Sequence, residues 1–352
     1  MLVYFLVFIG AAIIGLLYRR VKEKRLCSGI FIFLLFCIST LRSADIGSDY
    51  RTYISIFNQE LYIYGKGYNL INYLASLLGD SYVWLAMMVN IVIFTLLGYV
   101  YKKEVDKKYY FFALTLWVLN PYCFIQSSMN ILRQGCAMAC VLVAVYYIRR
   151  GRGKLLNFLI CILIAGSFHK SAYFFVMLFP FGLVHWKRPY HILLLAVCTV
   201  LNLLFSGSQL IQPFAKFLGY SGYLTVKPSQ FDMPVFTLLI VFVSLYLMYR
   251  YPLLYTNEKE KWYVDLYLVS LSALLILVKN DIAYRMYIYF SFAAPIAISY
   301  IVKNLSAKVR RAVETWLVQT GYLAYYSAMY WLFVLLQMIN HNEKYFPYRF
   351  FW

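Results

Sequence analysis

The chain alternates apolar stretches with short polar connections from one end to the other. Most of the apolar stretches have the length that crosses a bilayer core. They lie near residues 1–18, 26–41, 82–101, 109–126, 129–148, 155–168, 171–185, 191–206, 233–249, 262–278, 284–302 and 315–340. The pattern predicts an all-α fold, a polytopic membrane helical bundle of about 12 transmembrane helices. It also predicts a single integral membrane domain over residues 1–352.

Composition supports this class, because 63% of the 352 residues are hydrophobic and only 13% are charged. A soluble domain of this length needs more polar surface. The first apolar segment is followed, not preceded, by a basic cluster, and it has no clear small-residue cleavage site. We therefore expect a retained first helix rather than a signal peptide.

The net charge of +19 comes mainly from lysines and arginines in every second connection. These connections lie near residues 19–25, 102–108, 149–154, 187–188, 250–261 and 303–311. The positive-inside rule places them in the cytoplasm and both termini outside. The distribution predicts membrane lipids as partners and argues against nucleic acid.

Two outer connections are long. In 42–81, apolar residues recur at helical spacing, so we expect amphipathic helices that lie on the membrane or fold back into the bundle. In 207–232, prolines and glycines interrupt any long helix, and we expect a lid.

Four polar clusters fall on the outer side, where ionisable residues near hydrocarbon suggest a functional site. They are Arg42, Asp45, Asp49 and Arg51; then Asn130, Arg133 and Gln134; then His169, Lys170 and Ser171; then Lys279, Asn280, Asp281 and Arg285. There is no phosphate-binding glycine loop and no nucleophile elbow. Seven cysteines without a CxxC spacing indicate neither a disulfide framework nor a metal site. We expect no cofactor and no metal.

The first cluster combines acids with arginines. Asp45 is a candidate base, whereas Asp49 has the alternative of capping a helix that starts near Tyr50. Arg42 is a candidate anion ligand, with the alternative of extending to the membrane interface. Two acids alone are a weak signal for a divalent cation.

Arg133 lies inside an apolar segment and needs a partner. A planar guanidinium suits a diphosphate, and Asn130 and Gln134 could add hydrogen bonds to the same ligand. The alternative is an ion pair with Asp45 or Asp281.

The last two clusters offer a base and a second anion ligand. His169 can accept a hydroxyl proton, or it can hydrogen-bond to a helix end. Arg285 is a second candidate anion ligand, and Tyr284 can stack on a sugar ring. The alternative there is an interfacial aromatic belt with nearby charges.

The clusters, in this order, resemble the EpsG family of bacterial membrane proteins, a branch of the Wzy-type polysaccharide polymerases. The resemblance is carried by Arg42-x-x-Asp45-Ile-Gly-x-Asp49-Tyr50, Gly67-Tyr68-x-Leu70-x-Asn72, Met129-Asn-Ile-Leu-Arg133-Gln134, Phe168-His169-Lys-Ser171-Ala172, Arg285 with Tyr289-Phe290, and Phe346-Pro347-Tyr348. One departure is Lys66, which stands where the family pattern leads us to expect an acidic residue.

The resemblance implies a fold similar to the GT-C-type glycosyltransferases and a site on the outer (periplasmic) side of the bacterial inner membrane. It implies an enzyme that transfers a glycan from undecaprenyl diphosphate to the non-reducing end of a lipid-linked repeat unit. A chain-length regulator is a further expected partner. The diphosphate ligands would be Arg133, Arg285 and Arg42, and the base His169 or Asp45. Further polar contacts to substrate would come from Asp49, Asn130, Gln134, Asp281 and Tyr284.

Other functions stay open. A flippase or transporter of the same lipid-linked oligosaccharides is the main alternative, although no internal repeat is evident. A membrane acyltransferase and a scaffold for an assembly complex are two others. The sequence also does not separate a polymerase from a ligase, because both use the same class of donor.

Overall fold

The computed structural model describes residues 2–17, 24–59, 61, 63–148, 154–204, 234–279, 281–308, 312–339 and 348–350. Each of the twelve predicted apolar segments contains helix, which confirms the all-α class. Within the described ranges, the β pairing is limited to an isolated antiparallel bridge between Arg42 and Phe350. The predicted lid, 207–232, lies outside the described residues.

The number of membrane spans stays a prediction. Among the described residues, two continuous helical stretches have the length and apolar character of a span, Tyr82–Glu104 and Pro234–Leu253. A third is obtained if Tyr284–Phe292 and Ala294–Lys308, which meet at a bend of 52°, form one broken span. The other apolar helices are shorter.

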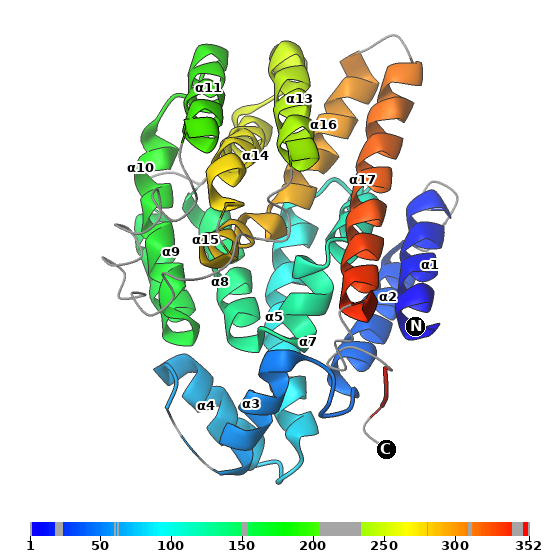
Figure 1. Cartoon of the computed structure of the whole chain (residues 1–352), viewed down its shortest axis with the longest axis vertical. Helices are drawn as coiled ribbons and strands as arrows, with labels where there is room; N and C mark the ends of the chain where they lie inside the picture. Colours follow the sequence, from blue (N-terminus) through cyan, green and yellow to red (C-terminus); the bar gives the residue numbers. More distant parts are fainter. Residues whose placement is uncertain are drawn as a thin grey trace. The chain divides into compact units, whose positions relative to one another are not determined.

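The chain divides into two compact units, Met1–Phe179 with Val313–Trp352, and Pro180–Ala312. We call them unit 1 and unit 2; the single domain expected from the sequence stays a prediction. The helices of unit 1 are α1 (Leu2–Leu17), α2 (Lys24–Thr40), α3 (Ser48–Asn58), α4 (Lys66–Ser76), α5 (Tyr82–Glu104), α6 (Tyr110–Leu119), α7 (Ser127–Met129), α8 (Leu132–Ile148), α9 (Leu155–Phe168), the 3-10 helix Lys170–Met177 and α17 (Ala312–Ile339), while α10 (Leu178–Leu183) crosses the boundary (Figure 1).

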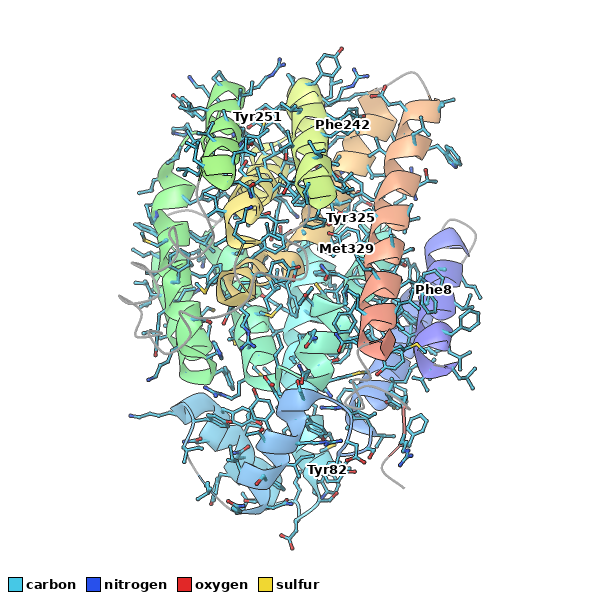
Figure 2. All side chains as sticks on the ribbon, viewed as in Figure 1. Phe8, Tyr82, Phe242, Tyr251, Tyr325 and Met329 are labelled. Atoms are coloured by element: carbon cyan, nitrogen blue, oxygen red, sulfur yellow. The ribbon has the colours of Figure 1, made fainter. Side chains whose placement is uncertain are left out.

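Helix α8 forms the core of unit 1. It is buried over almost its whole length and packs against α5 and α9. At the periphery, α1 packs on α6 and also meets α17, where the Tyr330 hydroxyl donates to the carbonyl of Tyr4 at 2.8 Å. The ring of Phe8 lies 5.2 Å from that of Trp331 in the same contact (Figure 2).

The expected amphipathic segment 42–81 contains α3 and α4, which lie at one end of unit 1 (Figure 1). Helix α4 buries Tyr68 and Ile71 against its neighbours α5 and α9. Its other face exposes Leu70, Leu74 and Leu77. An apolar outer face of this kind is typical of a helix that lies in a membrane interface.

Unit 2 is built around α14. Its helices are α11 (Arg188–Leu204), α13 (Pro234–Arg250), α14 (Glu258–Leu277), α15 (Asp281–Tyr287) and α16 (Ala294–Lys308). Helix α14 packs against α11, α13 and α16.

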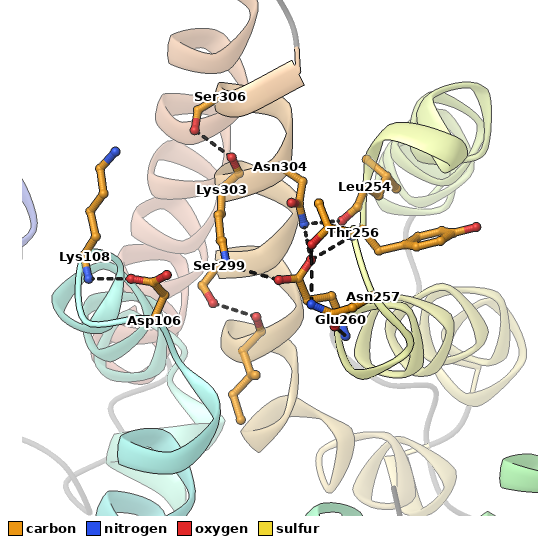
Figure 3. Close-up of polar contacts among 12 residues, drawn as sticks. Asp106, Lys108, Leu254, Thr256, Asn257, Glu260, Ser299, Lys303, Asn304 and Ser306 are labelled. Atoms are coloured by element: carbon orange, nitrogen blue, oxygen red, sulfur yellow. Dashed lines mark hydrogen bonds and ion pairs between the residues drawn. The ribbon is translucent and has the colours of Figure 1, made fainter.

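Two buried carboxylates lie in α14. Glu260 accepts hydrogen bonds from Thr256, Lys303 and Asn304 and thereby ties α14 to α16 (Figure 3). In the next turn, the Oδ1 of Asp265 lies 2.9 Å from the Nε2 of His191, within hydrogen-bond distance. His191 is itself buried beside this carboxylate.

Candidate functional site

The first three polar clusters come together at the end of unit 1 where α3 and α4 lie. The C-terminal ends of α2 and α9 lie there with the N-terminal ends of α5 and α8. Tyr50 contacts both Arg42 and Tyr82, and Arg133 contacts Phe168. Tyr82, at the start of α5, lies at the same end (Figure 2). The three clusters therefore share one end of unit 1, and the side of the membrane that they face stays a prediction.

The N-terminus of α3 is capped from the second cluster. A π-helical turn, Tyr122–Gln126, and the short α7 lead the chain to Asn130, and such turns often mark functional sites. The Asn130 Oδ1 accepts the backbone N–H of Asp49 at 2.8 Å and the Ser48 hydroxyl at 3.2 Å. Its Nδ2 donates to Gln126 Oε1 at 2.8 Å. The alternative that Asp49 caps this helix is wrong, because the helix starts at Ser48 and Gly47 occupies the cap position.

Gly47 permits this close approach. Its φ of 105° is a conformation that favours glycine. A Cβ at this position would lie 2.6 Å from the carbonyl oxygen of Met129. The backbone of the first cluster therefore packs directly against the backbone before the second cluster, and a side chain at position 47 would push the two apart.

Arg42 is fully buried. Its guanidinium lies 3.7 Å from the centre of the Tyr50 ring, and its Nη1 donates to the carbonyl of Ser39. Its Nε and Nη2 are buried and have no hydrogen-bond partner among the described residues. Within the same residues, no carboxylate lies within ion-pair distance of it. A buried guanidinium without a counter-ion is unfavourable, so this position is suited to an anionic ligand.

Arg133, in the first turn of α8, is half-buried. Its guanidinium lies 3.7 Å from the centre of the Tyr64 ring, and its Nε donates to the carbonyl of Phe168 at 3.3 Å. The alternative of an ion pair with Asp45 is not observed; the side chain of Asp281 lies outside the described residues. The contact with Phe168 joins the second cluster to the third.

A cluster of tyrosines connects the surroundings of the two arginines. The ring of Tyr53 in α3 lies 5.7 Å from that of Tyr64 and 5.4 Å from that of Tyr68. Tyr50, in the same helix as Tyr53, lies 6.1 Å from Tyr82. The hydroxyls of Tyr50 and Tyr68 are buried without a partner among the described side chains. These two hydroxyls are neutral hydrogen-bond donors near the guanidinium groups of Arg42 and Arg133.

The two candidate bases differ in their surroundings. His169 ends α9 in an extended conformation and is half-buried, with its Nδ1 2.6 Å from the Ser171 hydroxyl. Asp45 is exposed and pairs with the exposed Arg51 at 3.5 Å. Exposed pairs of this kind contribute little. His169 follows the residue whose carbonyl accepts from Arg133, whereas Asp45 lies in an exposed ion pair.

Four further predicted site residues stay predictions: Gln134 in unit 1, and Asp281, Tyr284 and Arg285 in unit 2. Gln134 is buried in α8. Tyr284 and Arg285 belong to α15 in unit 2, where Tyr284 is buried and Arg285 is exposed. The side chain of Asp281 lies outside the described residues.

Sequence reasoning missed the tyrosines that hold the arginines. Tyr50 and Tyr68 stood inside the motifs of the first cluster and its neighbour, and Tyr64 lies one helical turn before Tyr68. Aromatic residues beside buried arginines are a usable signal, because a guanidinium stacks on an aromatic face. In the described part of the chain, no group of three or more His, Cys, Asp or Glu side chains could hold a metal ion.

These features define a helical membrane protein with two arginines held by aromatic rings at one end of a bundle. The sequence profile of the EpsG family matches residues 25–350, nearly the whole chain, and the protein belongs to the EpsG family. This confirms the resemblance seen in the motifs and indicates a membrane polysaccharide polymerase of the Wzy type. No curated protein and no solved structure matches the chain.

Proposed function

We propose that the protein lengthens a polysaccharide by transferring a glycan from undecaprenyl diphosphate to an acceptor repeat unit. The observation that carries this proposal is the buried guanidinium of Arg42, whose Nε and Nη2 have no partner among the described residues. Removing an ion from water costs several kcal/mol unless a counter-ion or hydrogen bonds compensate. A diphosphate group supplies both the charge and the planar pairs of oxygens that a guanidinium binds well.

The chemistry follows from the direction in which charge moves. A hydroxyl of the acceptor sugar attacks the anomeric carbon of the donor, and the bond from that carbon to the diphosphate oxygen breaks. Negative charge develops on the leaving diphosphate, where Arg42 and Arg133 stabilise it. The arginines thus act more strongly in the transition state than in the ground state.

The proton of the attacking hydroxyl goes to His169. If its Nδ1–H donates to Ser171, which lies 2.6 Å away, the lone pair of the ring is on Nε2. That atom then accepts the proton. Asp49 and Asn130 shape the site through the start of α3, and Arg285, Tyr284, Asp281 and Gln134 remain candidate substrate contacts.

The site faces the outer side of the bacterial inner membrane in this proposal. The support is the concentration of lysines and arginines in the alternate connections, which the positive-inside rule assigns to the cytoplasm. A bundle that handles a lipid-linked donor on that side is similar in plan to the GT-C-type glycosyltransferases.

The experiment is reconstitution of the purified protein in liposomes with lipid-linked repeat units alone. We expect a ladder of products that differ by one repeat unit, together with released undecaprenyl diphosphate. Release without a ladder would contradict polymerisation, because the glycan would then have been transferred to water. Movement of intact units across the bilayer without any release would indicate a flippase.

A matched set of variants tests the base. H169A and S171A should lose activity, with S171A the milder because it removes only the partner of Nδ1. K170A, which changes the exposed neighbour, is the control. Wild-type rates in H169A together with loss in D45N would move the base to Asp45.

A further inference from the structure

The tail segment Tyr348–Phe350 lies across the residues that lead to Arg42. The backbone N–H of Ser43 donates to the carbonyl of Arg349 at 2.8 Å, beside the antiparallel bridge between Arg42 and Phe350. The Tyr348 hydroxyl donates to the carbonyl of Ile38 near the end of α2. The tail is therefore attached to both sides of Arg42 in the sequence.

Tyr348 also packs into unit 1. Its ring lies 5.8 Å from that of Tyr4 and 5.4 Å from that of Phe350. Burial raises the pKa of the Tyr348 hydroxyl, and the nearby charge of Arg42 lowers it by a smaller amount. The Tyr348 hydroxyl is thus neutral, and it is close enough to the Arg42 guanidinium for an electrostatic interaction.

Arg42 cannot be reached in this arrangement. Its side chain is completely buried, and its unpartnered Nε and Nη2 have essentially no surface open to water. A diphosphate must displace some cover before it touches these atoms. The tail is the part of this surrounding that lies outside the helices, whereas α2 and α3 belong to the helical framework.

We propose that the segment Tyr348–Phe350 is a gate over Arg42 that opens when the lipid diphosphate binds. The proposal rests on the proposed function, because it needs Arg42 as the diphosphate ligand. The closed state keeps an unpaired guanidinium away from water, which is unfavourable. An anion that binds only the open state, where it can pair with this guanidinium, therefore shifts the balance toward opening.

A disulfide tests the gate. Ser43 and Arg349 stand directly opposite each other in the antiparallel register, and opposed residues lie within disulfide reach. The variant S43C/R349C is made in a background without the seven native cysteines, with S43C and R349C alone as controls. Binding of undecaprenyl diphosphate in detergent is measured before and after oxidation, and again after reduction.

We expect the oxidised double variant to bind at least tenfold more weakly than its reduced form, with recovery on reduction and no change in either single variant. Equal binding in the oxidised and reduced forms would overturn the gate, as would failure of the disulfide to form. The proposed function fails separately if reduced protein does not bind the diphosphate, or if R42A binds it as well as wild type.

Discussion

The side-chain oxygen of Asn130 accepts the backbone N–H of Asp49 at 2.8 Å, across 81 residues of sequence. This hydrogen bond attaches the first turn of α3 to the turn that precedes α8. The side-chain amide of Asn130 therefore connects α3, which carries Tyr50, to the start of α8, which carries Arg133.

Loss of this cap should loosen α3. We expect N130A to destabilise the helix by about 1 kcal/mol, the usual effect of removing a cap. Trypsin cleavage after the exposed Arg51 should then become about fivefold faster, in line with that energy. N130D keeps an acceptor oxygen near the helix N-terminus and should be cleaved nearly as slowly as wild type. Equal rates for N130A and wild type would show that the cap does not hold α3.

The contact of α4 with the end of α9 depends on two glycines. A Cβ at Gly65 would overlap the carbonyl oxygen of Ser167, and a Cβ at Gly67 would overlap its hydroxyl. G65A and G67A should both lower thermal stability and activity. The double variant G67A/S167A should recover, because the hydroxyl is gone, whereas G65A/S167A should not, because the carbonyl remains. Recovery of both pairs, or of neither, would contradict the geometry.

Tyr64 should hold Arg133 through its ring. Y64F keeps the aromatic face and should retain activity. Y64A should reduce kcat/KM about three- to fivefold, since an exposed or half-buried cation–π contact contributes about 0.5–1 kcal/mol. In the R133A background, Y64A should have little further effect. Independent effects of the two substitutions, measured in the reconstituted assay, would show that Tyr64 acts elsewhere.

Much of this arrangement was predictable from the sequence. Most of the twelve apolar segments match helices to within a few residues, whereas 284–302 is divided between α15 and α16 and 171–185 between a 3-10 helix and α10. The strict alternation of the basic connections also put the first three clusters at one end. Motifs at Arg42, Arg133 and His169 identified the residues that the structure then brought together.

Other relationships depend on contacts between distant segments, which periodicity does not encode. The capping role of Asn130 needed the position of α3 relative to α8. The bridge from Arg42 to Phe350 joins residues from opposite ends of the chain. The complete burial of Arg42 is likewise a property of the packed structure and cannot be read from its place in the sequence.

Unit 2 should show a defined response to acid. Burial alone raises the pKa of Glu260, but hydrogen bonds from Thr256, Asn304 and Lys303 outweigh burial and lower the pKa to about 2. A carboxylate whose folded pKa is lowered stabilises the fold above its unfolded pKa of about 4.3, and that stabilisation is lost as pH falls toward the folded value. The Tm difference between wild type and E260Q in detergent should therefore shrink from pH 6 to pH 3.

The exposed Glu258 in the same helix provides the control, and E258Q should show no such trend. A difference between wild type and E260Q that stays constant over this range would mean that the carboxylate is not held by the observed hydrogen bonds.

The most direct test of the account is donor use by Arg42 variants in the liposome assay. R42A should lower kcat/KM for the lipid diphosphate donor by about 10²-fold, because a charged contact to the leaving group is lost. R42K keeps the charge without the planar fork and should be intermediate. R51A, which changes an exposed arginine of the same segment, should stay near wild type. Wild-type kcat/KM in correctly folded R42A and R42K would contradict the central claim that the buried guanidinium of Arg42 binds the diphosphate.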